Sequence, residues 1–234
     1  MNKFSIIIPT FNEVNNIEIL INEICIFLQK KIFEIIVVDD NSQDGTKKIL
    51  KKIKLKNNRL RYLIRKNVNR GLSKSIILGI SKTKYENIIV MDGDLQHNPR
   101  YLPKLCKTFS KKDLDFLVCS RDFKKRHGLS LIRFYSSKFL ILIINIFLGK
   151  KVSDPMSGFF IFKKKFFKSN KNYIYDKGFK ILMSLIYSTK KKLKIYEQRI
   201  IFKKRFNNKS KMNFLVIIHI LISLTYYLGL RLIK

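Results

Sequence analysis

Residues 35–42 read IIVVDDNS, and this segment decides the class of fold. Its first four residues are all apolar and β-branched, which is the pattern of a short strand buried on both faces. Strands of this kind are typical of parallel sheets that helices cover on both sides. The run ends at two aspartates, so we expect acidic groups at the carboxyl end of this strand.

The same pattern occurs at residues 4–9 (FSIIIP) and 87–91 (NIIVM). Apolar residues at helical spacing follow the first strand between residues 17 and 28, and a further short strand at 61–65 precedes a helix over 71–80. This alternation predicts an α/β fold with a mixed, mostly parallel sheet flanked by helices. Ligands of such sheets bind beyond the carboxyl ends of the strands, where Glu13, the Asp39–Asp40 pair and the Asp92–Asp94 pair fall.

The charge is strongly one-sided, with 49 Lys and Arg against 16 Asp and Glu and a net charge of +33. This balance excludes an acidic binding protein and predicts a polyanionic neighbour: nucleic acid, anionic lipid or a phosphorylated substrate. The lysines are dispersed and the sequence carries no zinc-finger, RNP or helix-turn-helix signature, which argues against nucleic acid. Three widely spaced cysteines in apolar contexts predict buried thiols in a reducing compartment, and we expect no signal peptide before the first strand.

The tripeptide Asp92-Gly93-Asp94 is the most informative acidic cluster. Two carboxylates at a strand end suit Mg²⁺ or Mn²⁺, and Gln96 would add a carbonyl oxygen. Gly93 would allow a ligand to approach the backbone closely. Asp-Gly-Asp is also a common turn, and the Asp39–Asp40 pair has a second interpretation, in which it begins a turn before a helix capped by Ser42 or Asp44.

Two long apolar stretches lie in the second half, at residues 129–148 and 214–230. Both are short for a bilayer span and carry a narrow polar stripe at helical spacing, as helices at a membrane interface do. The alternative is a pair of ordinary buried helices. We expect a catalytic domain at 1–212 that includes the first helix, and a membrane-associated helix at 213–234.

Several motifs occur together in an order typical of one family. They are IIPTFNE (7–13), IVVDDNSQDGT (36–46), NRGLS (69–73), VMDGDLQH (90–97) and DPMSGFF (154–160), followed by Arg205 and SKM (210–212). This series resembles the family 2 glycosyltransferases of the GT-A fold, and within them the dolichol-phosphate (polyprenyl-phosphate) mannosyltransferases. The departures are Arg100, where an acidic residue is usual, and Asn208-Lys209 in place of Gly-Glu.

The resemblance implies roles for individual residues. Pro9, Phe11, Glu13, Val37 and Asp39 would line the nucleotide site, and Asp92, Gly93, Asp94 and Gln96 would bind the donor diphosphate through Mg²⁺ or Mn²⁺. Arg205 and Lys211 would contact the donor phosphates, and Arg121, Arg133 and Ser137 would receive the acceptor phosphate. From the residues alone, the preferred interpretation of Arg121 is a surface charge and that of Arg133 a lipid-facing charge. His97 is interpreted as structural.

The reaction that the resemblance implies is the metal-dependent, inverting transfer of mannose from GDP-mannose to a polyprenyl phosphate at the cytoplasmic face of a membrane. A UDP-sugar donor is the alternative within the same class. The implied partners are the nucleotide sugar, the polyprenyl phosphate, membrane lipids and a separate membrane protein, without nucleic acid.

Overall fold

The computed structural model describes residues 2–66, 69–121, 131–177, 180–189, 191–202 and 214–233. Within these residues, seven strands form one sheet in the order β3-β2-β1-β4-β6-β5-β7. The strands are β1 (Lys3–Thr10), β2 (Ile32–Asp39), β3 (Leu60–Ile64), β4 (Asn87–Val90), β5 (Phe116–Arg121), β6 (Phe160–Lys163) and β7 (Ile195–Ile200). β6 is antiparallel to β4 and β5, and the other pairs are parallel. The predicted mixed, mostly parallel sheet is confirmed.

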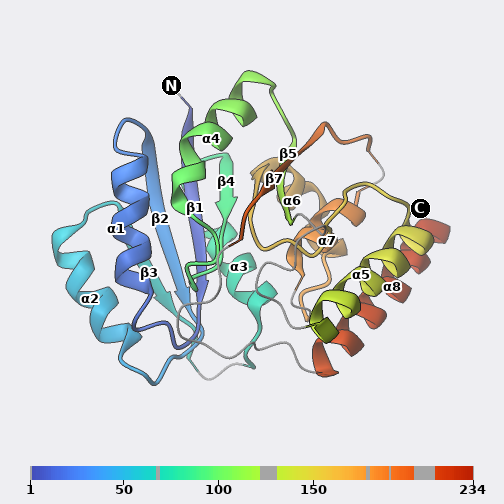
Figure 1. Ribbon diagram of the computed structural model, residues 1–234, viewed down its shortest axis with the longest axis horizontal. Helices are drawn as coiled ribbons and strands as arrows, with labels where there is room; N and C mark the ends of the chain where they lie inside the picture. The colour runs from blue at the N-terminus through green and yellow to red at the C-terminus, as the bar shows by residue number, and fades with distance from the viewer. Residues whose placement is uncertain are drawn as a thin grey trace.

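Helices cover both faces of this sheet (Figure 1). They are α1 (Ile17–Phe27), α2 (Thr46–Lys56), α3 (Leu72–Ser81), α4 (Leu102–Lys111), α5 (Leu131–Leu148), α6 (Lys164–Asn170), α7 (Ile181–Tyr187) and α8 (Phe214–Ile233), with short 3₁₀ turns at Pro99–Tyr101 and Lys171–Tyr173. Apolar residues of α1, α2 and α4 form one core with the sheet, and those of α3, α5, α6, α7 and α8 form the other. The second core extends from the sheet to the helix pair at the right of the figure.

Strand residues alternate between the two cores, as the pleat requires. Ile6 and Ile8 of β1 face the α1 side, whereas Ile7 faces the α3 side. This two-sided burial explains why the strands appear in the sequence as unbroken apolar runs. β2 and β3 lie on one side of β1, and β4 lies on its other side. The order of the strands along the chain therefore reverses between β1 and β4. Such a reversal is where ligands of open α/β sheets bind.

Pro9 sits in a central strand without loss of a ladder hydrogen bond. The carbonyl of Ile7 accepts from Met91 N–H on the β4 side, and the pairing of β1 with β4 ends at Ile7. Alternate residues of a parallel strand direct their backbone polar groups to the same side, so the nitrogen of Pro9 also faces β4, beyond the paired region. Proline therefore marks the place where β1 leaves its neighbour and its loop begins.

The helices α5 and α8 pack against each other at the end of the molecule (Figure 1). Their inner residues join the second core, and Ser137, Ser223 and Tyr227 of the polar stripes are buried there. The outward side is mostly apolar. Its large exposed apolar residues are Leu131, Tyr135, Phe139, Leu142, Ile146 and Phe147 of α5, and Leu221, Ile222 and Tyr226 of α8, and Lys138 and Thr225 are also exposed.

The two apolar stretches are therefore helices, as predicted, but they are not fully buried ones. None of the described helices is both long and apolar enough to span a bilayer. The proposed boundary between a domain at 1–212 and a helix at 213–234 stays a prediction, although Ile220, Leu224 and Tyr227 belong to the same core as the sheet.

Candidate active site

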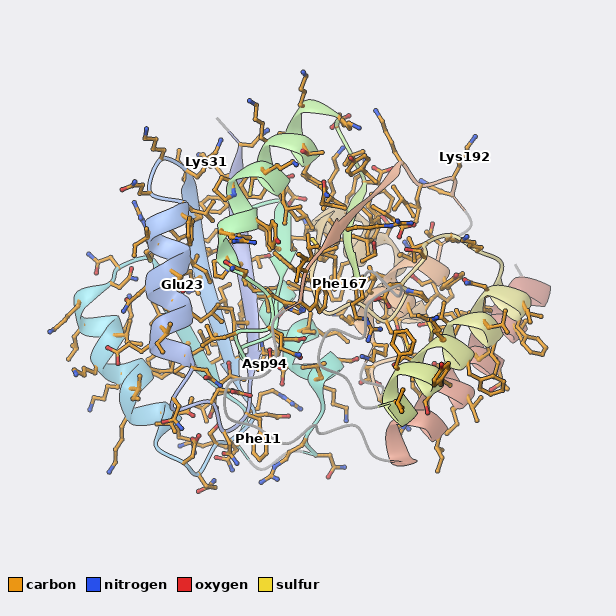
Figure 2. All side chains as sticks on the ribbon, viewed as in Figure 1. Phe11, Glu23, Lys31, Asp94, Phe167 and Lys192 are labelled. Carbon is orange, nitrogen blue, oxygen red and sulfur yellow. The ribbon has the colours of Figure 1, made fainter. Side chains whose placement is uncertain are left out.

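The loops after β1 and β2 are joined by hydrogen bonds. Asn12 N–H donates to Ser42 Oγ at 2.8 Å, and the Asn12 side chain accepts from Gln43 N–H at 3.1 Å. Glu13 N–H donates to Thr46 Oγ1 at 3.0 Å, which ties the first loop to the start of α2. These bonds bring Phe11 and Glu13 to the same edge of the sheet as the end of β2, and Figure 2 labels Phe11 and Asp94 at that edge.

Three residues at this edge have positive φ values, which residues other than glycine rarely adopt. They are Asn12 (φ 54°), Asn41 (φ 62°) and Leu95 (φ 61°), in the loops after β1, β2 and β4. Asparagine tolerates this region, but leucine does not do so readily. Strained backbone of this kind persists where the surroundings enforce it and gathers at functional sites. The three loops together therefore identify the candidate site.

Asp39 and Asp40 have different structural roles. Asp40 is paired with the buried Arg65 and also accepts from Gly71 N–H at 2.8 Å, so it anchors the start of α3. Asp39 is fully buried and accepts from both the hydroxyl and the N–H of Ser42. Burial raises the pKa of Asp39 above its usual value, and the hydrogen bonds from Ser42 oppose the rise. The N-cap residue of α2 is Gly45, so neither Ser42 nor Asp44 takes the predicted capping position, although Asp44 accepts from Thr46 N–H at 3.0 Å.

The Asp-Gly-Asp tripeptide follows β4 after one residue, Met91, and lies against the first loop. A Cβ added to Gly93 would meet Thr10 Oγ1 at 3.5 Å and Glu13 Cγ at 3.6 Å, so the backbone here touches the β1 loop. Asp94 is buried and accepts from Gln96 N–H at 3.2 Å, whereas the Asp92 side chain keeps 31% of its surface exposed. One carboxylate thus lies within the loop and the other faces outward.

His97 is hydrogen-bonded to the backbone of this loop. Its Nδ1 accepts from Asp92 N–H at 3.0 Å, so Nδ1 carries no proton and a neutral ring has its proton on Nε2. The buried ring stacks on Phe159 with centroids 5.1 Å apart and meets Phe202 edge-on at 4.9 Å. The structural role predicted for His97 is confirmed.

Arg121 is the predicted acceptor-site arginine that the structure describes in full. Its Nε and Nη2 atoms donate to the two carboxylate oxygens of Asp154 at 2.8 and 3.1 Å. Asp154 is fully buried, and 15% of the Arg121 side chain is exposed. A fork of this geometry fixes the plane of the guanidinium, which excludes the alternative of a solvated surface charge. Asp154 is not among the site residues predicted from the sequence, because 33 residues separate it from Arg121.

The segment that contains Asp154 also reaches the aspartate loop. Ser157 Oγ donates to the carbonyl of Cys119 at 2.6 Å, and the Cα of Gly158 lies so close to Asp92 that an added Cβ would meet Oδ2 at 2.5 Å. Residues 154–158 therefore touch both Arg121 and Asp92. Four residues span roughly 14 Å at most, so these two groups lie in one site.

The remaining predicted residues lie in different parts of the molecule. Phe11 lies under the guanidinium of Arg70, 4.2 Å from its ring centroid, at the rim of the site. Val37 is fully buried in the core, so its side chain packs within the sheet and its predicted contact with the base stays untested. Ser137 is buried on α5. Arg205, Lys211 and the side chain of Arg133 lie outside the described part of the chain.

The residues present fit a divalent metal that is shared with a ligand. Within the described residues, no three His, Cys, Asp or Glu side chains come together closely enough to hold a metal by themselves. Asp92 and Asp94 supply two carboxylates, and Mg²⁺ is commonly held by one or two carboxylates with phosphate oxygens and waters in its other positions. The site therefore suits a metal that arrives with a diphosphate.

The comparisons with known proteins agree with this geometry. The model of the glycosyl transferase family 2 matches residues 5–170, more than half of the chain. The chain therefore belongs to the family 2 glycosyltransferases.

Two similar relatives carry the same description. A dolichol-phosphate mannosyltransferase of Pyrococcus furiosus is 35% identical over 218 residues, covering 90% of this chain and 59% of the relative. One from Saccharomyces cerevisiae is 32% identical over 193 residues, covering 79% of this chain and 70% of the relative. The chain thus spans about three fifths of the length of the Pyrococcus relative.

A solved structure of glucosyl-3-phosphoglycerate synthase from Mycobacterium tuberculosis, in complex with Mn²⁺, UDP-glucose and phosphoglyceric acid, has the same fold. The TM-score is 0.72 at 18% identity, with 97% of this chain and 80% of that chain covered. At this identity the likeness shows the fold alone, which is that of the GT-A glycosyltransferases, as predicted.

Proposed function

We propose that this chain transfers mannose from GDP-mannose to a polyprenyl phosphate, with inversion at the sugar and with a divalent metal, at the cytoplasmic face of a membrane. The description of the two relatives as dolichol-phosphate mannosyltransferases supports the sugar and the acceptor. The three free cysteines, of which Cys106 and Cys119 are buried, suit a reducing compartment.

The observation that carries this proposal is the link through residues 154–158. One end of this segment fixes Arg121, and the other end abuts Asp92. An arginine held in a fixed plane is suited to bind a phosphate, and a partly exposed carboxylate beside it is suited to a metal–diphosphate. A transferase that joins a phosphorylated acceptor to a nucleotide sugar requires these two kinds of group side by side.

The chemistry places little demand on a general base. A phosphate oxygen of the acceptor is already anionic at neutral pH and would attack the anomeric carbon from the side opposite the diphosphate. The bond between that carbon and the diphosphate oxygen breaks, and the nucleoside diphosphate leaves with the electron pair. The difficulty is repulsion between two anions, which Arg121 would offset on the acceptor side.

A bound Mg²⁺ or Mn²⁺ would stabilise the charge that develops on the leaving diphosphate. Asp92 and Asp94 are the residues that would hold it, with Gln96 as the predicted third ligand. His97 fixes the backbone of the loop, and the buried Asp94 limits how far the loop can move. The neighbour solved with Mn²⁺, UDP-glucose and phosphoglyceric acid supports a divalent metal without deciding between the two ions.

The membrane part of the proposal rests on the outward side of α5 and α8. Aromatic and aliphatic residues gather there, while the polar side chains Ser137 and Ser223 are turned toward the protein. This is the reverse of a helix that faces water, and it suits a surface that enters the interfacial layer of a bilayer. The net charge of +33 adds attraction to anionic lipids.

The decisive experiment is transfer of radiolabelled sugar to polyprenyl phosphate in detergent micelles, with label counted in the organic phase. GDP-mannose, UDP-glucose and UDP-N-acetylglucosamine are offered separately, with and without EDTA. Label from GDP-mannose alone, lost in EDTA and restored by Mn²⁺ or Mg²⁺, is the expected result. Label from a UDP-sugar instead would show that the donor is a UDP-sugar and not GDP-mannose. Label that persists in EDTA would refute the requirement for a metal. Absence of label from any donor in the presence of metal would refute the acceptor.

A further inference from the structure

Gly158 lies closer to the Asp92 carboxylate than any side chain would allow. A Cβ added to Gly158 would lie 2.5 Å from Oδ2 of Asp92 and 3.0 Å from both Cγ and Oδ1. Carbon and oxygen atoms that are not bonded do not approach so closely, so one of the two residues would have to move. Every atom that this Cβ meets first belongs to the Asp92 side chain.

The segment around Gly158 is held in place and has little freedom to retreat. Asp154 is paired with Arg121, and Ser157 donates to the Cys119 carbonyl and accepts from Phe159 N–H at 3.2 Å. The carbonyl of Met156 accepts from Lys180 Nζ at 3.2 Å. An added methyl group would therefore be accommodated by rotation of the Asp92 carboxylate and not by displacement of the segment.

The backbone of Asp92 is fixed from the other side. His97 Nδ1 accepts its N–H, and the imidazole is held between Phe159 and Phe202. The nearest His97 nitrogen to the carboxylate, Nε2, is 3.8 Å from Oδ2, which is too long for a direct hydrogen bond. The backbone of Asp92 is thus held by His97, and Gly158 lies against its carboxylate.

We infer that Gly158 is a positioning residue for the metal site: its missing side chain leaves the space in which the Asp92 carboxylate is aimed at a divalent cation. The inference rests on the metal of the proposed function. Groups that orient a metal ligand typically change metal affinity by about 10- to 100-fold when they are altered, so Gly158→Ala should weaken binding on this scale.

The test is Mn²⁺ binding, followed by electron paramagnetic resonance of the free ion, alone and with either GDP or UDP present. The control is Gly229→Ala, because an added Cβ at Gly229 would meet nothing within 4 Å. We expect the dissociation constant for Mn²⁺ to rise at least roughly tenfold in Gly158→Ala and to stay unchanged in Gly229→Ala. Equal affinities for Gly158→Ala and the unaltered protein would overturn the inference.

A second measurement separates positioning from folding. Moving the end of a flexible side chain costs little, so Gly158→Ala should lower Tm by at most about 2 °C, and Asp92→Ala should remove any such fall because alanine lacks the atoms that clash. A Tm that stays low in the double variant would show that Gly158 serves the fold and overturn the inference. If the unaltered protein binds no Mn²⁺ under any of these conditions, both the metal of the proposed function and this inference are refuted. Loss of Mn²⁺ binding in Gly158→Ala alone is a different result and leaves the metal of the proposed function in place.

Discussion

The apolar side of α5 gives a quantitative prediction about membrane binding. Phe139 and Ile146 are 62% and 67% exposed on this side. Replacing both with serine should release the chain from lipid vesicles while leaving the fold intact, since neither residue belongs to the core. The change removes apolar surface without altering the net charge, so it separates the hydrophobic part of the attachment from the electrostatic part.

The magnitude follows from the exposed fractions. A phenylalanine can bury about 200 Å², so the exposed part of Phe139 amounts to roughly 120 Å², or about 3 kcal/mol on transfer out of water. The exposed two thirds of Ile146 adds about 1–2 kcal/mol. If the bilayer covers half of this surface, the loss is about 2 kcal/mol, or roughly a thirtyfold fall in the partition coefficient.

The assay is sedimentation with vesicles of neutral and anionic phospholipid, repeated at high salt. Leu55→Ser with Ile26→Ser is the matched control, because these residues are 81% and 63% exposed and also lie in helices, on α2 and α1. The control should sediment with vesicles as the unaltered protein does. Equal release by the control pair, or full retention of the α5 variant, would refute the reasoning that this side enters the membrane.

Three further predictions test the site and the core. Asp94→Asn keeps the acceptor for the loop but removes a metal-binding charge, so transfer should fall at least about a hundredfold and Mn²⁺ binding should be lost at an unchanged Tm; retained Mn²⁺ affinity would exclude Asp94 as a ligand. Asp154→Asn leaves Arg121 without its charged partner and should lower the free energy of unfolding in urea by about 3 kcal/mol. KM should rise more for polyprenyl phosphate than for the donor. An equal rise in both KM values would show that Arg121 is not part of the acceptor site. Burial raises the pKa of Cys106 to about 12, so its reactive thiolate forms only in strong alkali. At pH 8, Ellman's reagent should label the half-buried Cys25 and spare Cys106 until denaturant is added, and rapid labelling of native Cys106 would contradict this.

The first half of the fold was predictable because its signals are local. Each buried strand is followed within a few residues by a polar loop and a helix with regular apolar spacing. The observed β1, β2, β3 and β4 therefore fall close to the predicted ranges, with β1 and β2 longer by a few residues. Parallel pairing then brought their carboxyl ends together without any further information, and that placed the three acidic clusters correctly.

The second half follows from pairings that the sequence order does not reveal. β6 runs antiparallel between β4 and β5, and β7 pairs with β5 from the far edge. These strands are short, and the phenylalanines of β6 suit a buried helix as well as a strand. Only the tertiary contacts decide between the two, which is why no strand was predicted after residue 91.

The polar stripes of α5 and α8 show a different limit of sequence reasoning. Helical spacing correctly placed Ser137 and Ser223 on one side of each helix, but periodicity does not say which side faces the protein. The structure turns these small polar residues inward, where Ser223 Oγ donates to the Ile220 carbonyl of its own helix at 2.7 Å. A hydroxyl satisfied in this way can face a core at little cost, so the apolar majority is left outside.

The contacts at the centre of the site have a common origin in the antiparallel strand. β6 lies between β4, which leads into Asp92, and β5, which ends in Arg121. Because β6 runs against both neighbours, the segment that enters it, residues 154–158, lies at the edge where the other two strands end. Asp154 therefore reaches Arg121 and Gly158 reaches Asp92, although 33 and 66 positions separate them in the sequence. A fully parallel sheet would place the start of β6 at the opposite edge, so the reversed direction of β6 is what brings the two halves of the candidate site together.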